Sequence, residues 1–338
     1  MLIKRIINFF VSFCILIVFI SVVSCDKTEE AVTIIACSDF QHPDGHNAGA
    51  KNVKRIVAAL KNNGVSSASA LFCCGDYDYK YEHKSDGIDI LKKSLSDIAI
   101  KDYYFVQGNH DAVVGSFGMC RSGNNDPING DYAVYVINED DYMWHNGDEE
   151  RIKNTSEKLS DYLDIKLHQD YKKPIFVLSH LPLHYSMRTE NNGDAMYADY
   201  IFEVINRAAA DGLEIFFLFG HNHSNGWDDY LGGACVYLKK GDYINIANHS
   251  KSDFVTKKLY FTYFNPGYIG YYSNVNGADD ALTMSVIKIN DDKVEVSRYS
   301  ENGIHPLKSK GVTNIYKNET AYPPDKKEYT SPDVITVN

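Results

Sequence analysis

Hydrophobic residues in the first 225 positions gather into short continuous runs, and a polar cluster follows each run. Continuous runs of this length, bounded by turn residues, are typical of strands that are buried on both faces of a sheet. The runs cover residues 31–37, 68–74, 103–106, 132–137, 175–178 and 215–219. The pattern therefore predicts buried strands at each of these places.

Between these runs, hydrophobic residues recur every three or four positions, which is the period of an amphipathic helix. The positions that carry this period are Val53, Ile56, Val57 and Leu60; Ile88, Leu91, Leu95 and Ile98; Leu159, Leu163 and Leu167; and Phe202, Ile205 and Ala209. Strands that alternate with helices predict right-handed crossovers and a largely parallel sheet. Two stretches lack any period, the Gly-rich segment 112–131 and the acidic segment 138–151, and both are expected to be loops.

Beyond Asn225 the pattern changes to short alternating strands with almost no helical signal. The expected strands are 234–238, 243–247, 259–263, 281–289 and 294–299. We expect the region 226–302 to form antiparallel strands that complete a sandwich against the first part of the chain. The region 303–338 is polar and contains several prolines, so it is expected to be a poorly ordered tail.

The N-terminus has the features of a secretory signal peptide. Lys4 and Arg5 precede an apolar run from Ile6 to Val23, the order of charged and hydrophobic regions in such signals. The run ends in Ser24-Cys25, which resembles the bacterial lipoprotein signal and predicts removal of residues 1–24 and lipidation of Cys25. An uncleaved membrane anchor is the alternative, because the run is close to the ~20 residues that span a bilayer. Either way, the folded part is expected outside the cytoplasm.

The overall charge and the cysteines narrow the functional classes. A formal net charge of -11 over 338 residues argues against an electrostatic nucleic-acid-binding surface. Of seven cysteines, five remain once Cys14 and Cys25 are set aside, and their odd number and irregular spacing do not fit a disulfide framework. Cys37, Cys73 and Cys74 lie inside apolar runs and are expected to be small buried side chains.

Polar clusters that could bind a metal follow five of the predicted strands. They are Asp39-Phe40-Gln41, Gly75-Asp76, Gly108-Asn109-His110-Asp111, Ser179-His180 and Gly220-His221-Asn222-His223. In open α/β sheets, ligands bind at the carboxyl ends of the strands. One terminal Asp is explained by helix capping, but a recurrence at successive strand ends is not. In extended backbone the side chains of His221 and His223 point the same way and can face one site.

In chain order, these clusters resemble the motifs of the calcineurin-like metallophosphoesterases. The family pattern is D-x-H, G-D, G-N-H-[D/E], H and G-H-x-H, and the resemblance covers roughly residues 33–224. Each block alone is a weak signal, whereas all five in order are specific. The resemblance implies an α/β (α+β) fold, a four-layer α/β/β/α sandwich of two mixed sheets, with a core at 32–225.

The resemblance also implies a role for each residue. Asp76 would bridge two divalent ions, and the other ligands divide into two sets: Asp39, Gln41 and His223 for one ion, and Asn109, His180 and His221 for the other. His110 would be catalytic, protonating the leaving oxygen or stabilising charge on the phosphoryl group. Mixed nitrogen and oxygen ligands suit Mn, Fe or Zn. Two such ions can generate hydroxide and bind both the attacking and the leaving oxygen.

The resemblance predicts an extracytoplasmic hydrolase of phosphomonoesters or phosphodiesters, held at the membrane by a lipid anchor. Gln41 departs from the family, which usually has His at this position, so metal identity is open. The alternative is a binding protein that keeps the fold with little or no catalysis. The substrate is an unspecified phosphate ester.

Several other polar residues are weaker candidates. Asp78 could orient His110 or lie in an exposed turn, and Asp111 has no assigned role. Arg121 and Arg188 could bind phosphate or be ordinary surface residues. His184 is expected either to support the ligands or to be a loop residue, and the aromatic segment 260–272 either lines a groove or packs in the core.

Overall fold

The protein is represented by a computed structural model that describes most of the chain after residue 30. The described residues are 31–42, 44–79, 86–111, 118–128, 130–142, 149–184, 197–221, 237–247, 254–270, 282–290 and 293–305, with short strands between 308 and 337. The chain divides after Ala31, and the unit from Val32 onward is the one considered below. The predicted signal peptide and Cys25 lie outside the described residues. Within the described part, no helix has the length and apolar character needed to cross a membrane.

The first sheet combines parallel and antiparallel strands. In spatial order it contains β14 (Gly303–His305), β13 (Lys293–Ser300), β12 (Met284–Asn290), β1 (Val32–Cys37), β2 (Ser67–Cys73) and β3 (Ala99–Phe105). β1, β2 and β3 run parallel, whereas β12 and β13 are antiparallel to their neighbours. β19 (Val334–Val337) also pairs with β13. Cys37 lies beside Cys73, and Cys73 beside Phe105, so the three parallel strands end level with one another.

The second sheet has a parallel centre and short antiparallel edges. Its order is β4 (Gly123–Asn124), β5 (Ala133–Ile137), β6 (Ile175–Ser179), β7 (Ile215–Leu218), β11 (Thr262–Phe264) and β8 (Tyr237–Leu238). β5, β6, β7 and β11 run parallel to one another, whereas the edge strands β4 and β8 are antiparallel to their neighbours. Three small strand pairs complete the list: β9 (Tyr243–Ala247) with β10 (Phe254–Lys258), β15 (Lys308–Ser309) with β18 (Tyr329–Thr330), and β16 (Thr313–Asn314) with β17 (Glu319–Thr320).

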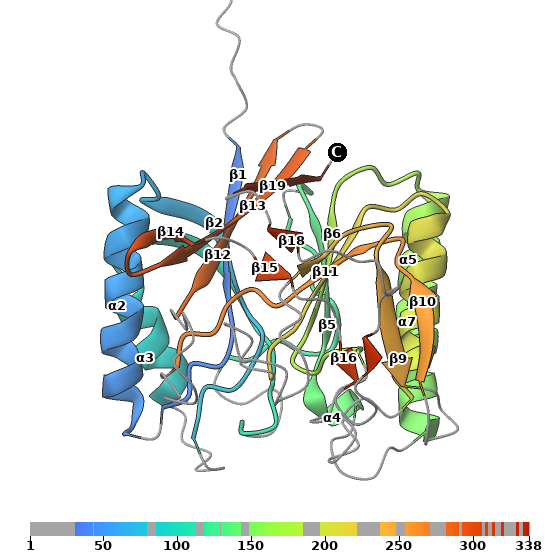
Figure 1. The fold of residues 1–338 in the computed structure, drawn as a ribbon, viewed down its shortest axis with the longest axis horizontal. Helices are drawn as coiled ribbons and strands as arrows, with labels where there is room; N and C mark the ends of the chain where they lie inside the picture. The colour runs from blue at the N-terminus through green and yellow to red at the C-terminus, as the bar shows by residue number, and fades with distance from the viewer. Residues whose placement is uncertain are drawn as a thin grey trace, which may run out of the picture. The chain divides into compact units, whose positions relative to one another are not determined.

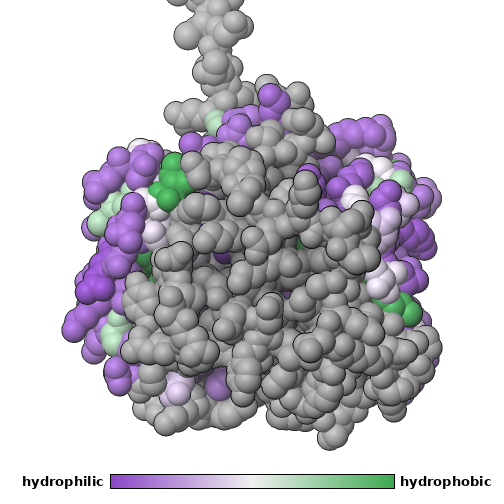
Figure 2. Space-filling model, in the orientation of Figure 1, coloured by the Kyte–Doolittle hydropathy of each residue, from purple (hydrophilic) through white to green (hydrophobic). Residues whose placement is uncertain are grey.

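Helices cover the outer face of each sheet (Figure 1). α2 (His46–Asn62) and α3 (Asp86–Ser94) pack on the first sheet, and α5 (Glu149–His168) and α7 (Ala198–Ala210) pack on the second. A short α4 (Glu139–Tyr142) precedes α5. On the flanks formed by these helices, the visible described residues are mostly hydrophilic, as the outward face of an amphipathic helix should be (Figure 2).

The apolar runs are continuous because each strand packs into two cores. In β1, Ile34 faces the core between the sheets, whereas Ile35 faces the core beneath α2 and α3. In β7, Phe216 faces the inter-sheet core and Phe217 faces the core beneath α5 and α7. Burial of one such side chain contributes about 1.5–3 kcal/mol. The predicted four-layer α/β/β/α sandwich of two mixed sheets is therefore confirmed.

The later strands are placed differently from the sequence expectation. They do not make a separate antiparallel layer: β12 and β13 extend the first sheet, and β11 joins the second sheet in parallel to β7. The segment 138–151, expected to be a loop, contains α4 and the first residues of α5. Its acidic residues include Glu149 and Glu150 in the first turn of α5, where carboxylates interact favourably with the helix dipole.

Three further strands, β10, β14 and β19, were missed for local reasons. β10 occupies Phe254–Lys258, just before the strand expected at 259–263. The polar tail, expected to be poorly ordered, contributes β14 and β19 at the edge of the first sheet. All four residues of β19, Val334–Val337, are β-branched, a composition that favours a strand within an otherwise polar region.

Candidate metal centre

The candidate centre lies where strands of both sheets end. Asp39 follows β1, Asp76 follows β2, and His221 follows β7, and all three have left-handed backbone with φ of 52°, 59° and 66°. Residues other than glycine rarely adopt this backbone conformation. Asp170 and Tyr197 are the only other such residues in the described part of the chain. Backbone strain of this kind clusters at functional sites, so its concentration on predicted ligands supports the site.

Three glycines allow the strand ends to approach each other. A Cβ on Gly75 would lie 2.6 Å from Nδ1 of His180, and one on Gly220 would lie 2.5 Å from the carbonyl oxygen of Cys74. A Cβ on Gly108 would collide with the carboxylate of Asp76. Any larger residue at these places would push the polar side chains apart. The glycines therefore set the close packing of the centre.

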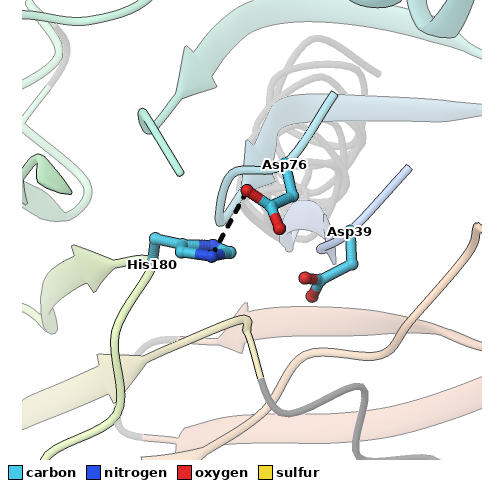
Figure 3. Close-up of side chains that lie close together, drawn as sticks. All are labelled: Asp39, Asp76 and His180. Atoms are coloured by element: carbon cyan, nitrogen blue, oxygen red, sulfur yellow. Dashed lines mark ion pairs between the residues drawn. The ribbon is translucent and has the colours of Figure 1, made fainter. Parts of the chain in front are cut away.

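Asp39, Asp76 and His180 form its buried middle (Figure 3). One oxygen or nitrogen atom from each lies within 4.8 Å of the others, and Nε2 of His180 is 3.4 Å from Oδ1 of Asp76. None of the three is more than 1% exposed. Two carboxylates buried this closely are costly without a compensating positive charge. A divalent cation would supply that charge.

The orientation of His180 points the same way. Its Nδ1 lies 2.7 Å from the carbonyl oxygen of Cys74. Since a carbonyl only accepts, Nδ1 carries the proton and donates, which leaves the lone pair of Nε2 facing Oδ1 of Asn109 at 2.9 Å. Two acceptors at this distance need a cation between them, either a proton or a metal ion. A histidine ligand held by a carbonyl through its other nitrogen is the usual arrangement at metal sites.

Asn109 and His221 bring the two sheets together. Oδ1 of Asn109 also lies 3.1 Å from Nδ1 of His221, and the backbone N–H of His221 donates to Oδ1 of Asp39 at 3.1 Å. Donor atoms that share one ion at about 2.0–2.1 Å lie roughly 3 Å apart when adjacent in its shell. Oδ1 of Asn109 has this spacing to Nε2 of His180 and to Nδ1 of His221. The residues present therefore fit a metal ion.

Gln41 joins the centre from the other side of Asp76. Its Nε2 donates to Oδ2 of Asp76 at 3.0 Å, and its backbone N–H donates to the carbonyl oxygen of Asp76 at 3.0 Å. The amide oxygen of Gln41 is the atom that could bind a metal. His223, the third predicted ligand of this set, lies outside the described residues.

His110 differs from the ligands in its exposure. Its backbone N–H donates to Oδ1 of Asp76 at 3.0 Å, so the residue is fixed beside the centre. Its side chain is only partly buried, whereas Asp39, Asp76 and His180 are fully buried. A partly exposed imidazole beside buried ligands can reach a substrate.

Comparison with known proteins identifies this arrangement. The family model of the calcineurin-like phosphoesterases matches residues 32–225. The chain belongs to this family. The resemblance drawn from the motifs is therefore confirmed for this region, and the candidate Asp39, Asp76 and His180 cluster lies inside it.

Among the similar solved structures, one supports the fold with a TM-score above 0.5. A dimetal phosphatase from Danio rerio superposes with a TM-score of 0.52 at 11% identity, covering 82% of this chain and 98% of that one. GAP50, the anchor in the inner membrane complex of Plasmodium, gives 0.46 at 12% identity, with 87% and 95% covered. A Vps29 mutant from Entamoeba histolytica gives 0.33 at 14% identity, with 80% and 92% covered. The comparison with curated proteins gave no match.

Asp111 has a structural role in this protein that sequence reasoning missed. Its carboxylate accepts backbone N–H bonds from Asp76 at 2.9 Å, Tyr77 at 2.7 Å and Gly108 at 2.7 Å. It therefore ties the ends of β2 and β3 together. Burial raises the pKa of Asp111 to about 7, while the three N–H groups favour its ionised form. Its place directly after His110 was the only signal in the sequence.

Three weaker candidates from the sequence are Asp78, Arg121 and Arg188. Asp78 is buried and pairs with His46 at 2.9 Å, so it does not lie in an exposed turn. That hydrogen bond raises the pKa of His46. Arg121 is exposed, and Arg188 lies outside the described residues.

His184 and the aromatic segment belong to the core. Nδ1 of His184 lies 2.7 Å from the hydroxyl of Tyr263, and the ring packs on Phe219 with centroids 5.5 Å apart. Burial lowers the pKa of His184 to about 3. Phe261, Tyr263 and Phe264 are buried as well, so this part of the aromatic segment packs in the core.

Proposed function

We propose that this chain hydrolyses phosphomonoesters or phosphodiesters at a binuclear metal centre. The observation that carries the proposal is the convergence of nitrogen and oxygen atoms from both sheets at one edge. The residues concerned are Asp39, Asp76, Asn109, His180 and His221. Mixed ligands of this kind suit Mn, Fe or Zn. When bound, such ions supply a hydroxide nucleophile and neutralise charge on the phosphoryl group.

The two oxygens of Asp76 support its assignment as the bridging ligand. Oδ1 is 3.4 Å from Nε2 of His180, and Oδ2 is 3.0 Å from Nε2 of Gln41. One oxygen therefore faces the predicted set of Asn109, His180 and His221, and the other faces the set that includes Gln41. A single carboxylate placed in this way can contribute one oxygen to each of two ions.

His110 is the proposed proton donor to the leaving oxygen. Its backbone is fixed by Asp76, and its imidazole is the partly exposed one at the centre. An imidazole has an ordinary pKa near 6.5, so it can hold and release a proton near neutral pH. The proposed metal ligands would bind and orient the phosphoryl group through the ions that they hold.

We also propose that the enzyme acts outside the cytoplasm, held at the membrane by a lipid on Cys25. The support is the charged and hydrophobic pattern of residues 4–23 followed by Ser24-Cys25. Intact mass of the membrane-extracted protein should show loss of residues 1–24 and addition of acyl chains.

Metal removal and restoration test the function directly. The purified protein is stripped with a chelator and reloaded with Mn, Fe or Zn, and hydrolysis of nitrophenyl mono- and diesters is measured together with metal content. We expect hydrolysis only after metal is restored. A protein that takes up metal but cleaves neither ester favours the binding-protein alternative, and one that takes up none contradicts both the centre and the activity.

A further inference from the structure

A short segment after β11, residues 265–270, reaches the centre although it lies outside the region 32–225 that matches the family. We call this segment the strap. The carbonyl oxygen of Gly267 accepts a hydrogen bond from the backbone N–H of Ser38 at 2.7 Å. In return, the N–H of Ile269 donates to the carbonyl oxygen of Ser38 at 3.2 Å. Ser38 also donates from its hydroxyl to Gly267 at 3.0 Å. The strap therefore runs beside β1 where that strand meets Asp39.

The residues from Ser38 to Gln41 are held from both sides. On one side is the strap, and on the other the N–H of Asp39 donates to the carbonyl oxygen of Gly75 at 2.9 Å. The strap comes so close that a Cβ on Gly270 would clash with the carbonyl oxygen of Gln41 and lie 2.6 Å from that of Asp39. Two flanking backbones fix the strained conformation of Asp39, whose φ is 52°.

The strap is itself anchored to the first sheet and to α2. Ser285 of β12 donates its hydroxyl to the carbonyl oxygen of Pro266 at 2.7 Å, and Asn52 of α2 donates to that of Gly270 at 2.9 Å. Arg298 of β13 donates Nη2 to the carbonyl oxygen of Asn265. Arg298 is only 2% exposed, and a guanidinium so deeply buried is costly to place. This buried guanidinium anchors Asn265, the first residue of the strap.

The same stretch also touches the half of the centre that the second sheet supplies. The carbonyl oxygen of Phe264, directly before the strap, accepts the N–H of Phe219 at 3.3 Å. Gly220 and His221 follow Phe219 at once. One continuous stretch from Phe264 to Gly270 thus contacts the strand ends that carry His221 and Asp39.

We propose that the strap is a positioning element that sets Asp39 and Gln41 against His221 and so determines how tightly the ion of Asp39 and Gln41 is held. This inference rests on the proposed function, because it assumes that these residues bind metal. The strap contacts the backbone of the ligand residues and so orients them without binding the ion itself. The loss of an orienting partner of this kind typically weakens metal affinity ~10–100-fold.

Metal titration of two strap variants tests the inference. Binding of Mn²⁺ to the stripped full-length protein is followed by the electron paramagnetic resonance of free Mn²⁺, which resolves a tight and a weak ion without requiring activity. Gly270→Ala should weaken one ion ~10–100-fold and leave the other unchanged. Asn52→Ala removes only the anchor from α2 and should weaken the same ion a few-fold.

Asn206→Ala is the matched control. Asn206 of α7 donates Nδ2 to the carbonyl oxygen of Lys258 at 3.0 Å, so it is a helix asparagine that holds a backbone carbonyl, as Asn52 does, but away from the centre. It should leave both affinities unchanged at a comparable loss of melting temperature. If Gly270→Ala and Asn52→Ala bind both ions as the wild type does, the strap has no positioning role. If they weaken both ions equally, or Asn206→Ala weakens one ion too, the effect is general destabilisation and the inference is wrong. A wild type that binds no Mn²⁺ overturns the proposed function instead.

Discussion

The two sheets contribute to the centre in different ways. The first supplies the proposed oxygen ligands. Hydrogen bonds between neighbouring strand ends hold them in place, such as those from the backbones of Asp76 and Gly108 to Asp111. The second supplies imidazoles that reach across: Nδ1 of His180 donates to Cys74, and the N–H of His221 donates to Asp39. The oxygen half is therefore built within its own sheet, whereas the imidazole half is oriented by the other sheet. A change at Asp76, which faces both ligand sets, should therefore disturb both halves, whereas changes in the imidazole half should remain local.

Asp76→Asn should have the largest effect, because Asp76 belongs to the oxygen half and faces both ligand sets. The amide removes a negative charge that both ions need, so both should be lost and hydrolysis should fall by more than the ~10–100-fold typical of an outer-shell change. Elemental analysis of the purified variant measures the metal content. Two full equivalents remaining would remove the bridging assignment.

His110→Asn should separate chemistry from metal binding. General acid catalysis contributes ~10²–10⁴-fold, which is about 3–5 kcal/mol of barrier. The variant should keep near-normal metal content and lose kcat by that order. The loss should be smaller for nitrophenyl esters, whose leaving group needs little protonation. Full activity on an alkyl phosphate, or loss of the metals, contradicts the role given to His110.

The core beside the imidazole half contains a buried neutral histidine, His184. Its burial makes the free energy of unfolding sensitive to pH. Burial lowers the pKa of His184 to about 3, against an ordinary value near 6.5. Between these values the unfolded chain binds a proton that the folded chain does not, so stability is complete above about pH 6.5 and is lost as the pH falls toward 3. From pH 7 to pH 5 this residue should cost about 2 kcal/mol.

His184→Gln isolates this contribution, because the amide can still hydrogen-bond to the hydroxyl of Tyr263 but does not titrate. Urea unfolding of both proteins at pH 7 and pH 5 measures it. The variant should lose about 2 kcal/mol less than the wild type between these pH values. Equal losses in the two proteins would show that His184 is not neutral in the fold.

The sequence predicted the residues of the oxygen half better than it predicted the residues that hold either half in place. Buried parallel strands have continuous apolar runs, so their ends and the ligands after them, such as Asp39 and Asp76, were visible in the sequence. The supports were not visible: Asp111 acts through backbone N–H groups, and the strap meets Ser38 from 229 positions away. Neither interaction leaves a periodic or compositional signal, because both depend on which distant backbones the fold brings together.

Gln41 offers the finest test of the comparison, because it lies in the oxygen half but faces only one side of Asp76. Gln41→Ala removes one neutral ligand and its hydrogen bond to Oδ2 of Asp76. One ion should therefore bind about tenfold more weakly while the other is retained. Gln41→His restores the residue that the family usually has, and the imidazole should tighten the same ion, since nitrogen is the better ligand for Zn or Fe.

Gln107→Ala is the control for both Gln41 variants. Gln107 is a buried glutamine at the end of β3, and its side-chain oxygen accepts the N–H of Asp140 at 3.1 Å rather than facing the centre. Its loss should reduce stability by about 1 kcal/mol, the typical net contribution of one hydrogen bond, without changing either affinity. Measured by the same Mn²⁺ titration, a Gln41→Ala protein that binds both ions normally would leave Gln41 as a residue that orients Asp76 and does not bind metal. Loss of both ions in that variant would instead mean that the oxygen half cannot be divided, and that its two ligand sets form one cooperative site.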